Sequence, residues 1–148
     1  MLNNPTANQA LPISRRTVFL STDGIRAARG ISTDKVKQMV DDGGLLWVFN
    51  LGRLPGDGHI RHLRFWLPEI LDASAVAKLG IEEVVSKIIP AGRRTVNGSE
   101  LGQWFLISRP TVSRIGRETG GKLKNRVWHV EREALANYLR SRWIGGLK

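Results

Sequence analysis

The sequence predicts a mainly helical α+β fold made of two tandem modules, each with two helices, a tight turn between them and a small β-hairpin. Three observations predict this fold class. An apolar pattern at helical spacing occurs twice, so that Gly24–Ser32 corresponds to Glu100–Ser108. The segment Arg-Arg-Thr-Val stands before both copies, at 15–18 and at 93–96. A glycine pair follows each expected second helix, and a short apolar segment of strand character follows the glycines.

The two repeated patterns do not share one offset. The Arg-Arg-Thr-Val segment begins at 15 and again at 93, whereas the helical pattern begins at 24 and again at 100. This difference predicts a register slip of two residues between strand and helix. We expect four parts in the chain. They are a flexible tail at 1–14, the first module at 15–80, a connecting helix or linker at 81–92 and the second module at 93–148.

In the first module, the Ser32 hydroxyl is expected to cap the second helix, and Pro68 is expected to open a further helix. The expected elements, in chain order, are a helix over 22–29, a turn at 30–31, a helix from Ser32 to Asp42, strands over 45–51 and 61–67 around a loop at 55–58, a helix over 69–79 and a connecting helix over 81–89.

In the second module, Ser99 is expected to cap the first helix and Ser108 the second, near whose start Pro110 is tolerated. The glycines at 120–121 end the second helix. The expected elements are a helix from Ser99, a turn at 106–107, a helix over 109–118, a basic hairpin with strands at Leu123 and 127–130, and a closing helix over 131–143.

The charge is large and unevenly placed. The chain carries a net charge of +10, with +2 in residues 1–76 and +8 in residues 77–148. Such an excess on a globular composition indicates a polyanionic partner, either nucleic acid or an anionic membrane surface. The asymmetry between the halves favours a localised binding surface in the second half.

The order helix, tight turn, helix, β-hairpin is that of a winged helix-turn-helix. The segment LGQWFLISRPTVSRIGRE at 101–118, followed by NRVWHVEREALANYLRSR at 125–142, resembles the excisionase and MerR-like winged-helix families. The first half resembles the same module through LRFWLPEIL at 63–71. The resemblance implies double-stranded DNA as the partner and two winged-helix copies in tandem. No MerR-type effector or dimerisation region follows the second copy, so ligand sensing is not implied.

Candidate DNA contacts follow from the inward placement of Val112 and Ile115, which leaves the polar residues of helix 109–118 outward or flanking. A major groove admits one helix, arginine bonds guanine bidentately, and serine or threonine reaches a base or a phosphate. The alternative is a solvated helix face. The expected base contacts are Arg109, Ser113 and Arg114, the expected backbone contacts are Thr111 and Arg117, and the expected wing contacts to phosphate or minor groove are Lys122, Lys124 and Arg126.

Further candidates lie at the start of the second module or in the first one. They are Arg93, Arg94, Lys35, Lys37, Gln38, Arg61 and Arg64. The second helix of the first module also carries Asp34, Asp41 and Asp42, which phosphates repel. That helix therefore either reads DNA weakly or contacts a protein, and both roles stay open.

No pattern of catalytic residues is visible, and we expect neither an enzyme nor a cofactor or metal site. The chain has no cysteine, which excludes disulfides, zinc ribbons and thiol catalysis. His59 and His62 lack a nearby third ligand. The five tryptophans are expected to be mostly core or hairpin anchors, with stacking on unpaired bases as the alternative. No signal peptide or apolar run of membrane-spanning length is visible, so we expect a soluble, cytoplasmic, nucleoid-associated protein.

Two functions of different class remain. The first is a sequence-specific DNA-binding protein, either a transcriptional regulator or an excisionase-like recombination accessory factor, whose two modules read subsites roughly 10 bp apart. The second is an assembly or adaptor protein of the plasmid partition or replication type, with one module on DNA and the other on protein. The acidic first-module helix and the apolar end Trp143-Ile144 motivate the second, through a partner protein or a homo-oligomer.

Overall fold

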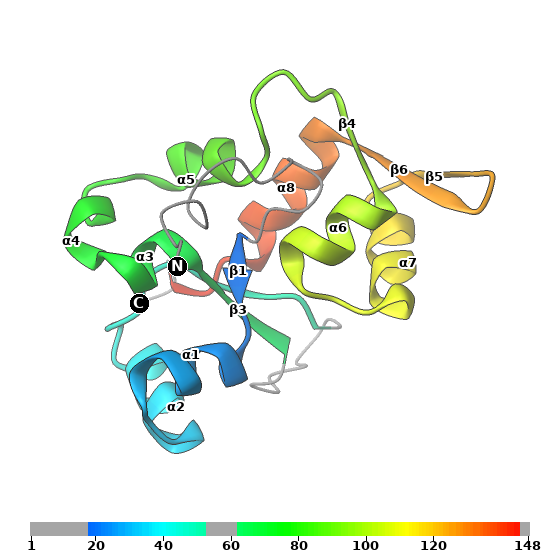
Figure 1. Ribbon diagram of the computed structural model, residues 1–148. Coiled ribbons are helices and arrows are strands. Elements are labelled where there is room, and N and C mark those ends of the chain that lie inside the picture. Colours follow the sequence, from blue (N-terminus) through cyan, green and yellow to red (C-terminus); the bar gives the residue numbers. More distant parts are fainter. Residues whose placement is uncertain (1–17, 53–61, 146–148) are drawn as a thin grey trace, which may run out of the picture.

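The first half of the chain builds a three-stranded antiparallel sheet and two helices. In the computed structural model, which describes residues 18–52 and 62–145, its elements are β1 (Phe19–Leu20), α1 (Thr22–Arg29), α2 (Thr33–Asp41), β2 (Val48–Asn50) and β3 (Leu63–Trp66). The sheet order is β1-β3-β2 (Figure 1). The expected tail at 1–14, the loop at 55–58 and Arg61 lie outside the described residues.

The connection between the halves is helical. It consists of α3 (Leu67–Leu71), α4 (Ala73–Val76) and α5 (Ile81–Ile88). The expectation of a single helix over 69–79 is wrong, because Asp72 leaves the helical conformation at φ −158° and ψ 89°. Its carboxylate accepts a hydrogen bond from the Ala75 backbone N–H at 3.3 Å. This local bond caps α4 and competes with continuation of α3.

The second half repeats the order of the first. Its elements are β4 (Thr95–Asn97), α6 (Gly98–Phe105), α7 (Arg109–Glu118), β5 (Lys122–Lys124), β6 (Val127–Glu131) and α8 (Arg132–Arg142), and its sheet order is β4-β6-β5. The N-cap of α6 is Asn97 rather than the expected Ser99, because Asn97 and Glu100 form a reciprocal capping box. Ser108 caps α7 as expected.

The correspondence between the halves holds at one offset from strand to helix. The N-cap Ser21 corresponds to the N-cap Asn97, and Ser32 corresponds to Ser108 at the same offset. This offset also relates Gly30 to Leu106, which both end a helix in the left-handed conformation. The expected slip of two residues therefore does not occur. The valines of the two Arg-Arg-Thr-Val segments are not equivalent in space, since Val18 precedes β1 whereas Val96 lies inside β4.

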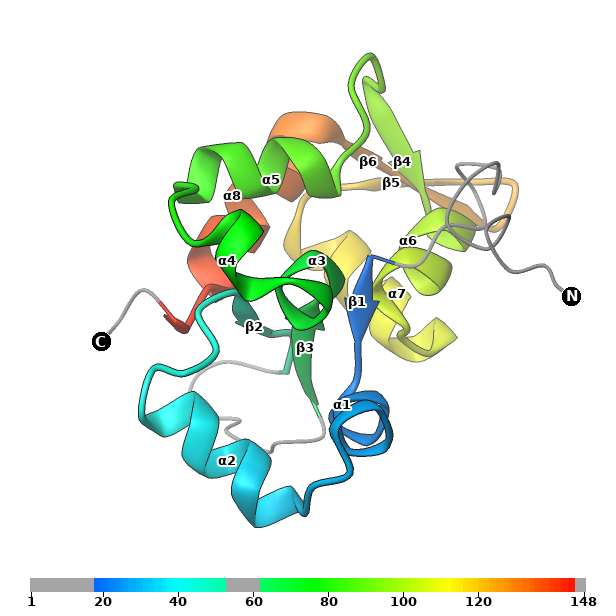
Figure 2. The ribbon, with the colours of Figure 1, turned by 60° about the vertical axis from the view of Figure 1, so that its left-hand side comes forward.

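The larger of two hydrophobic clusters joins the two halves, while the buried residues of the smaller one all lie within 25–70. The larger cluster combines Phe19 and Phe49 with Leu101, Trp104 and Phe105. The Phe19 and Phe105 rings meet edge to face with centroids 5.2 Å apart. Figures 1 and 2 show β1 beside α6, where the Val18 N–H donates to the Trp104 carbonyl at 3.3 Å. Because apolar side chains of both halves are buried in this cluster, each half stabilises the fold of the other.

The C-terminal end of the described chain belongs to this packing. Trp143 stacks on Trp47 at a centroid distance of 4.9 Å, and its indole N–H donates to the Leu46 carbonyl at 2.8 Å. The Ile144 N–H donates to the Val48 carbonyl at 3.0 Å. The apolar end that suggested a partner surface thus packs against the first half of the same chain, with Trp143 and Ile144 half-buried. Trp47, Trp66 and Trp104 are fully buried, as expected for core anchors.

Candidate nucleic-acid interface

Helix α7 owes its position to a sharp turn and to two apolar anchors. Leu106 reverses the chain at φ 55°, and the Ser108 hydroxyl accepts the Thr111 N–H at 3.4 Å, which starts the helix. Val112 and Ile115 are buried in the core. With 3.6 residues per turn, this anchoring leaves Arg109, Ser113 and Arg117 on one outer line, spaced by four residues. We call these three residues the α7 stripe.

Arg114 lies beside the α7 stripe on the flank of the helix that faces the first half. Its side chain is 14% exposed and forms an ion pair with Glu118 at 3.3 Å. Its guanidinium also donates to the Leu51 and Gly52 carbonyls at the end of β2. The expectation that Arg114 points outward is therefore wrong, because the first half packs where sequence periodicity alone predicts solvent.

Arg142 completes this junction from α8. Its side chain is 3% exposed and donates to Glu118 at 3.2 Å and to the Asn50 and Gly52 carbonyls. The guanidinium carbon lies 4.8 Å from the centre of the Tyr138 ring, and burial raises the pKa of the Tyr138 hydroxyl. Glu118 thus serves two arginines. The positive charge of Arg114 and Arg142 connects the halves of the protein and is not offered to solvent.

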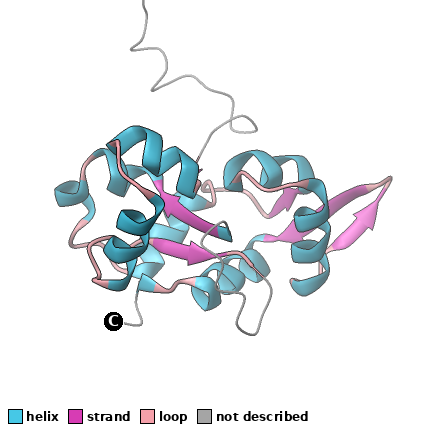
Figure 3. Ribbon diagram, turned by 90° about the horizontal axis from the view of Figure 1, so that it is seen from below, coloured by secondary structure: helices cyan, strands magenta, loops and turns pink. Residues whose placement is uncertain are grey.

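The β5–β6 hairpin projects from the body beyond the helices (Figure 3). Its two-residue loop, Asn125-Arg126, has φ of 50° and 67°. Positive φ at both central residues is the type I′ pattern, whose twist matches that of the paired strands. Lys122, Lys124 and Arg126 are all exposed, so the hairpin forms a cationic projection.

Trp128 docks the hairpin on α7. Its indole N–H donates to the Ser113 hydroxyl at 3.3 Å. Its ring lies directly on Gly116, where an added Cβ would stand 2.5 Å from Trp128 Cδ2. Leu123 is paired with Trp128 across the strands and therefore shares its face of the hairpin. The ring consequently determines how the hairpin is oriented relative to the α7 stripe.

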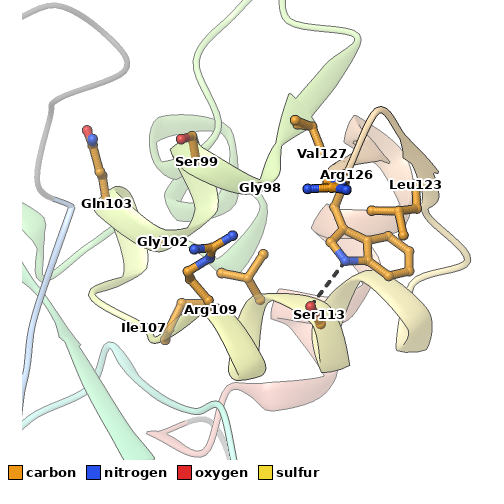
Figure 4. A pocket seen from close by; sticks show the side chains of 12 residues that line it. Gly98, Ser99, Gly102, Gln103, Ile107, Arg109, Ser113, Leu123, Arg126 and Val127 are labelled. Carbon is orange, nitrogen blue, oxygen red and sulfur yellow. Dashed lines mark hydrogen bonds between the residues drawn. The ribbon is translucent and has the colours of Figure 1, made fainter.

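A groove of about 630 Å³ runs between α6, α7 and the hairpin. Figure 4 shows the guanidinium groups of Arg109 and Arg126 at this groove, one from the start of α7 and one from the hairpin loop. Ser99 and Gln103 of α6 also line it. Neither residue is among the DNA contacts predicted from the sequence, which in the second module lie on helix 109–118, on the hairpin and at Arg93-Arg94. The exposure of Ser99 and Gln103 on the side away from Leu101 and Trp104 is the pattern that identifies them.

Five cations of this region carry no compensating charge. We call Arg109, Arg117, Lys122, Lys124 and Arg126 the basic face. All five are exposed, and within residues 18–52 and 62–145 none of their side chains forms an ion pair or a hydrogen bond. Unpaired cations concentrated on an exposed helix and an adjacent hairpin create a positive potential suited to an extended polyanion.

Two other predicted contacts are engaged inside the protein. Arg64 donates to the Phe105, Leu106 and Leu63 carbonyls at 2.9, 2.7 and 2.8 Å, and burial lowers the pKa of its guanidinium. It thereby binds the C-terminal end of α6 to the first sheet. Arg93 pairs with Glu100 at 2.5 Å, and this hydrogen bond raises the pKa of Arg93.

The remaining predicted residues are accessible to different degrees. Arg94 is exposed, and its carbonyl accepts the Arg132 N–H at 2.9 Å. Thr111 is half-buried, and its hydroxyl lies 3.1 Å from that of Ser108. Lys35, Lys37 and Gln38 are exposed on α2.

The equivalent line on α2 differs chemically from the α7 stripe. When Ser32 is aligned with Ser108, the stripe residues Arg109, Ser113 and Arg117 correspond to Thr33, Lys37 and Asp41. The α2 line therefore carries one cation and one anion, whereas the α7 stripe carries two cations. Only the second half presents a uniformly basic helix surface among the described residues.

Other site chemistries find no support in the described part of the chain. His59 lies outside it, and within it no three His, Cys, Asp or Glu side chains are grouped as metal ligands require. No described helix has both the length and the apolar character needed to cross a bilayer. Comparison with protein-family models, with curated proteins and with solved structures finds no match to this chain.

Proposed function

We propose that the protein binds double-stranded DNA through its second half, with α7 in the major groove and the β5–β6 hairpin along the sugar-phosphate backbone. In this proposal α6, α7 and the hairpin act as a winged helix-turn-helix. The protein is a sequence-specific regulator or a recombination accessory factor. The observation that carries the proposal is the basic face, whose five exposed cations have no partner within the described residues.

Two properties of this region favour duplex DNA among polyanions. A B-form major groove is about 12 Å wide and accepts one helix, and α7 is an exposed helix whose outer line carries two arginines. Next to it, the hairpin offers three cations on a narrow two-stranded projection, which is suited to contact with phosphates. Arg109 and Arg117 are the proposed base contacts, while Lys122, Lys124 and Arg126 are the proposed backbone contacts.

The first half has a supporting role in this proposal. Its core packing and Arg64 hold α6, and its β2 end receives Arg114 and Arg142. The mixed charge of the α2 line weakens the case for reading a second subsite. It is also the remaining motivation for an adaptor role, because Trp143 and Ile144 pack within the chain.

Salt-dependent binding tests the proposal with a matched pair of variants. The double variant Lys122→Gln/Lys124→Gln removes two charges from the hairpin, and Lys35→Gln/Lys37→Gln removes two from α2. Each phosphate contact contributes about 0.9 to the slope of log affinity against log salt. We expect the hairpin variant to lower the slope by up to about 1.8 and the α2 variant to leave it nearly unchanged.

The measurement is fluorescence anisotropy of a labelled duplex of about 20 bp at a series of salt concentrations, since affinities without a stated salt concentration cannot be interpreted. Both variants have the same net charge, so a nonspecific effect of charge would lower both slopes equally. Equal slopes for the two variants would contradict the assignment of the hairpin. Absence of salt-sensitive binding by the wild-type protein would contradict the proposed function itself.

A further inference from the structure

The hydroxyl of Ser113 differs from three other hydroxyls in or at the end of helices in this protein. Thr119, Ser141 and Ser86 donate their protons to backbone carbonyls three or four residues earlier, at 2.8, 2.7 and 2.8 Å. This back-bonding is the usual fate of a serine or threonine inside a helix. Ser113 makes no such bond within the described residues, so its proton is not donated.

The acceptor capacity of the same oxygen is partly used. The indole N–H of Trp128 donates to Ser113 Oγ at 3.3 Å, as drawn in Figure 4. A hydroxyl has one proton and two lone pairs, while an indole nitrogen only donates. The Trp128 bond therefore occupies one lone pair of Ser113. It also directs the hydroxyl proton away from the indole, because two donors cannot face each other.

Ser113 occupies the middle of the α7 stripe and lines the groove beside Arg109. Arg109 and Arg117 lie one helical turn to either side of it, about 6 Å along the axis in each direction. A donor held between two arginines would meet the centre of whatever base sequence the stripe contacts. The major-groove edges offer N7 of both purines, O6 of guanine and O4 of thymine as acceptors, and the amino groups of adenine and cytosine as donors; N7 is the acceptor that both purines share.

We infer that Trp128 holds Ser113 as a hydrogen-bond donor to N7 of a purine at the centre of the DNA site. The inference rests on the proposed function. Trp128 is then a positioning residue for base recognition, in addition to its packing on Gly116. A cytosine at that position of the contacted strand presents no major-groove acceptor and would be disfavoured, while a thymine offers O4 in place of N7.

Replacing single atoms in the DNA tests the inferred contact between Ser113 and N7 of a purine. A duplex enriched from a random library by the wild-type protein is remade with 7-deazapurine at each purine in turn, which removes N7 and preserves Watson–Crick pairing. We expect the wild-type protein to lose roughly five- to tenfold in affinity at one central purine, the effect of one neutral hydrogen bond. Ser113→Ala should bind the natural and the 7-deaza duplex equally.

Trp128→Phe separates positioning from packing, because phenylalanine keeps an aromatic ring but has no N–H. We expect it to retain salt-sensitive binding and to lose most of the 7-deaza penalty. If Trp128→Phe melts like the wild type in circular dichroism and keeps the full penalty, Trp128 does not orient Ser113. Ser113→Ala needs no change at Trp128, so it decides the serine contact even if the hairpin moves in Trp128→Phe.

DNA binding and the contact of Ser113 with a base are refuted by different results. If the wild-type protein binds no duplex, both the proposed function and this inference are overturned. If the wild-type protein selects a site but no 7-deaza position depends on Ser113, the inference alone is overturned and DNA binding stands.

Discussion

Replacing Gly116 with alanine should destabilise the protein, although alanine is the better helix former. The added Cβ would lie 2.5 Å from Trp128 Cδ2 and 2.6 Å from Cε3, whereas carbon atoms in contact prefer about 3.5–4.0 Å. The ring and α7 must separate by about 1 Å or more to restore that spacing. Such overpacking typically costs about 1–3 kcal/mol, against about 1 kcal/mol gained from replacing a helical glycine.

Gly102 provides the matched control, since it also lies inside a helix. There an added Cβ meets its nearest neighbour, the Ile107 carbonyl oxygen, at an ordinary 3.5 Å. Gly102→Ala should therefore stabilise the protein by about 0.5–1 kcal/mol. Gly116→Ala should instead lower the free energy of unfolding by up to about 2 kcal/mol, the overpacking cost less the gain in helix propensity.

Thermal and urea melts followed by circular dichroism measure both variants. A change of 1 kcal/mol corresponds to about 2–4 °C in Tm for a chain of this size. Gly102→Ala should therefore raise Tm above the wild-type value, and Gly116→Ala should lower it. In a Trp128→Ala background, Gly116→Ala should lose its penalty, because the clashing ring is gone. Stabilisation by Gly116→Ala in the wild-type background would refute the docking of Trp128 on α7.

Three other predictions concern the arginines of α7, the turn before it and the junction between the halves. Arg114→Ala should lower the free energy of unfolding, because it leaves the Leu51 and Gly52 carbonyls and Glu118 with fewer donors, and it should not change which base sequence the protein prefers. Arg109→Ala should change the preferred base sequence and leave the free energy of unfolding nearly unchanged. Thermal melts and selection from a random DNA library, done on both variants, distinguish the two cases. Leu106→Gly should raise Tm, because a left-handed non-glycine residue costs about 1–2 kcal/mol, and an unchanged or lower Tm would mean that the leucine side chain contributes more packing than its strain costs. Tyr138 is the only tyrosine, and burial raises its pKa, so the folded state favours the neutral phenol. The stability that this group contributes is intact below the ordinary tyrosine pKa and declines as the pH rises from there to the raised pKa of the folded state. Tyrosinate absorbance should therefore appear at higher pH in the native protein than in the protein unfolded in urea, and coincident titrations would contradict the burial of Tyr138.

Local features of the fold were readable from the sequence because each depends on neighbours along the chain. Helix α1 spans the expected residues 22–29, and α7 spans the expected residues 109–118. Ser32 and Ser108 cap the helices assigned to them. A serine hydroxyl that accepts an N–H three residues later, and an apolar residue every three or four positions, are short-range patterns.

The sequence did not predict which arginine side chains are exposed and which bind groups inside the protein, because this depends on contacts between residues far apart in the chain. Arg114 and Arg117 lie on the same helix and have the same chemistry, yet Arg114 binds carbonyls of residues 51 and 52 and Arg117 is exposed. Nothing within α7 separates them, since the burial of Arg114 is decided by the packing of β2 on the other side. Arg64 likewise serves the end of α6, far along the chain from its own strand.

Composition and periodicity therefore determined that this chain has two similar helical halves and a strongly basic second half. The tertiary structure decided which of those charges are available to a partner. The physical reason is that helix periodicity places a side chain on one side of its own helix, whereas only the packing of the whole chain determines whether that side meets solvent, a carboxylate or a backbone carbonyl.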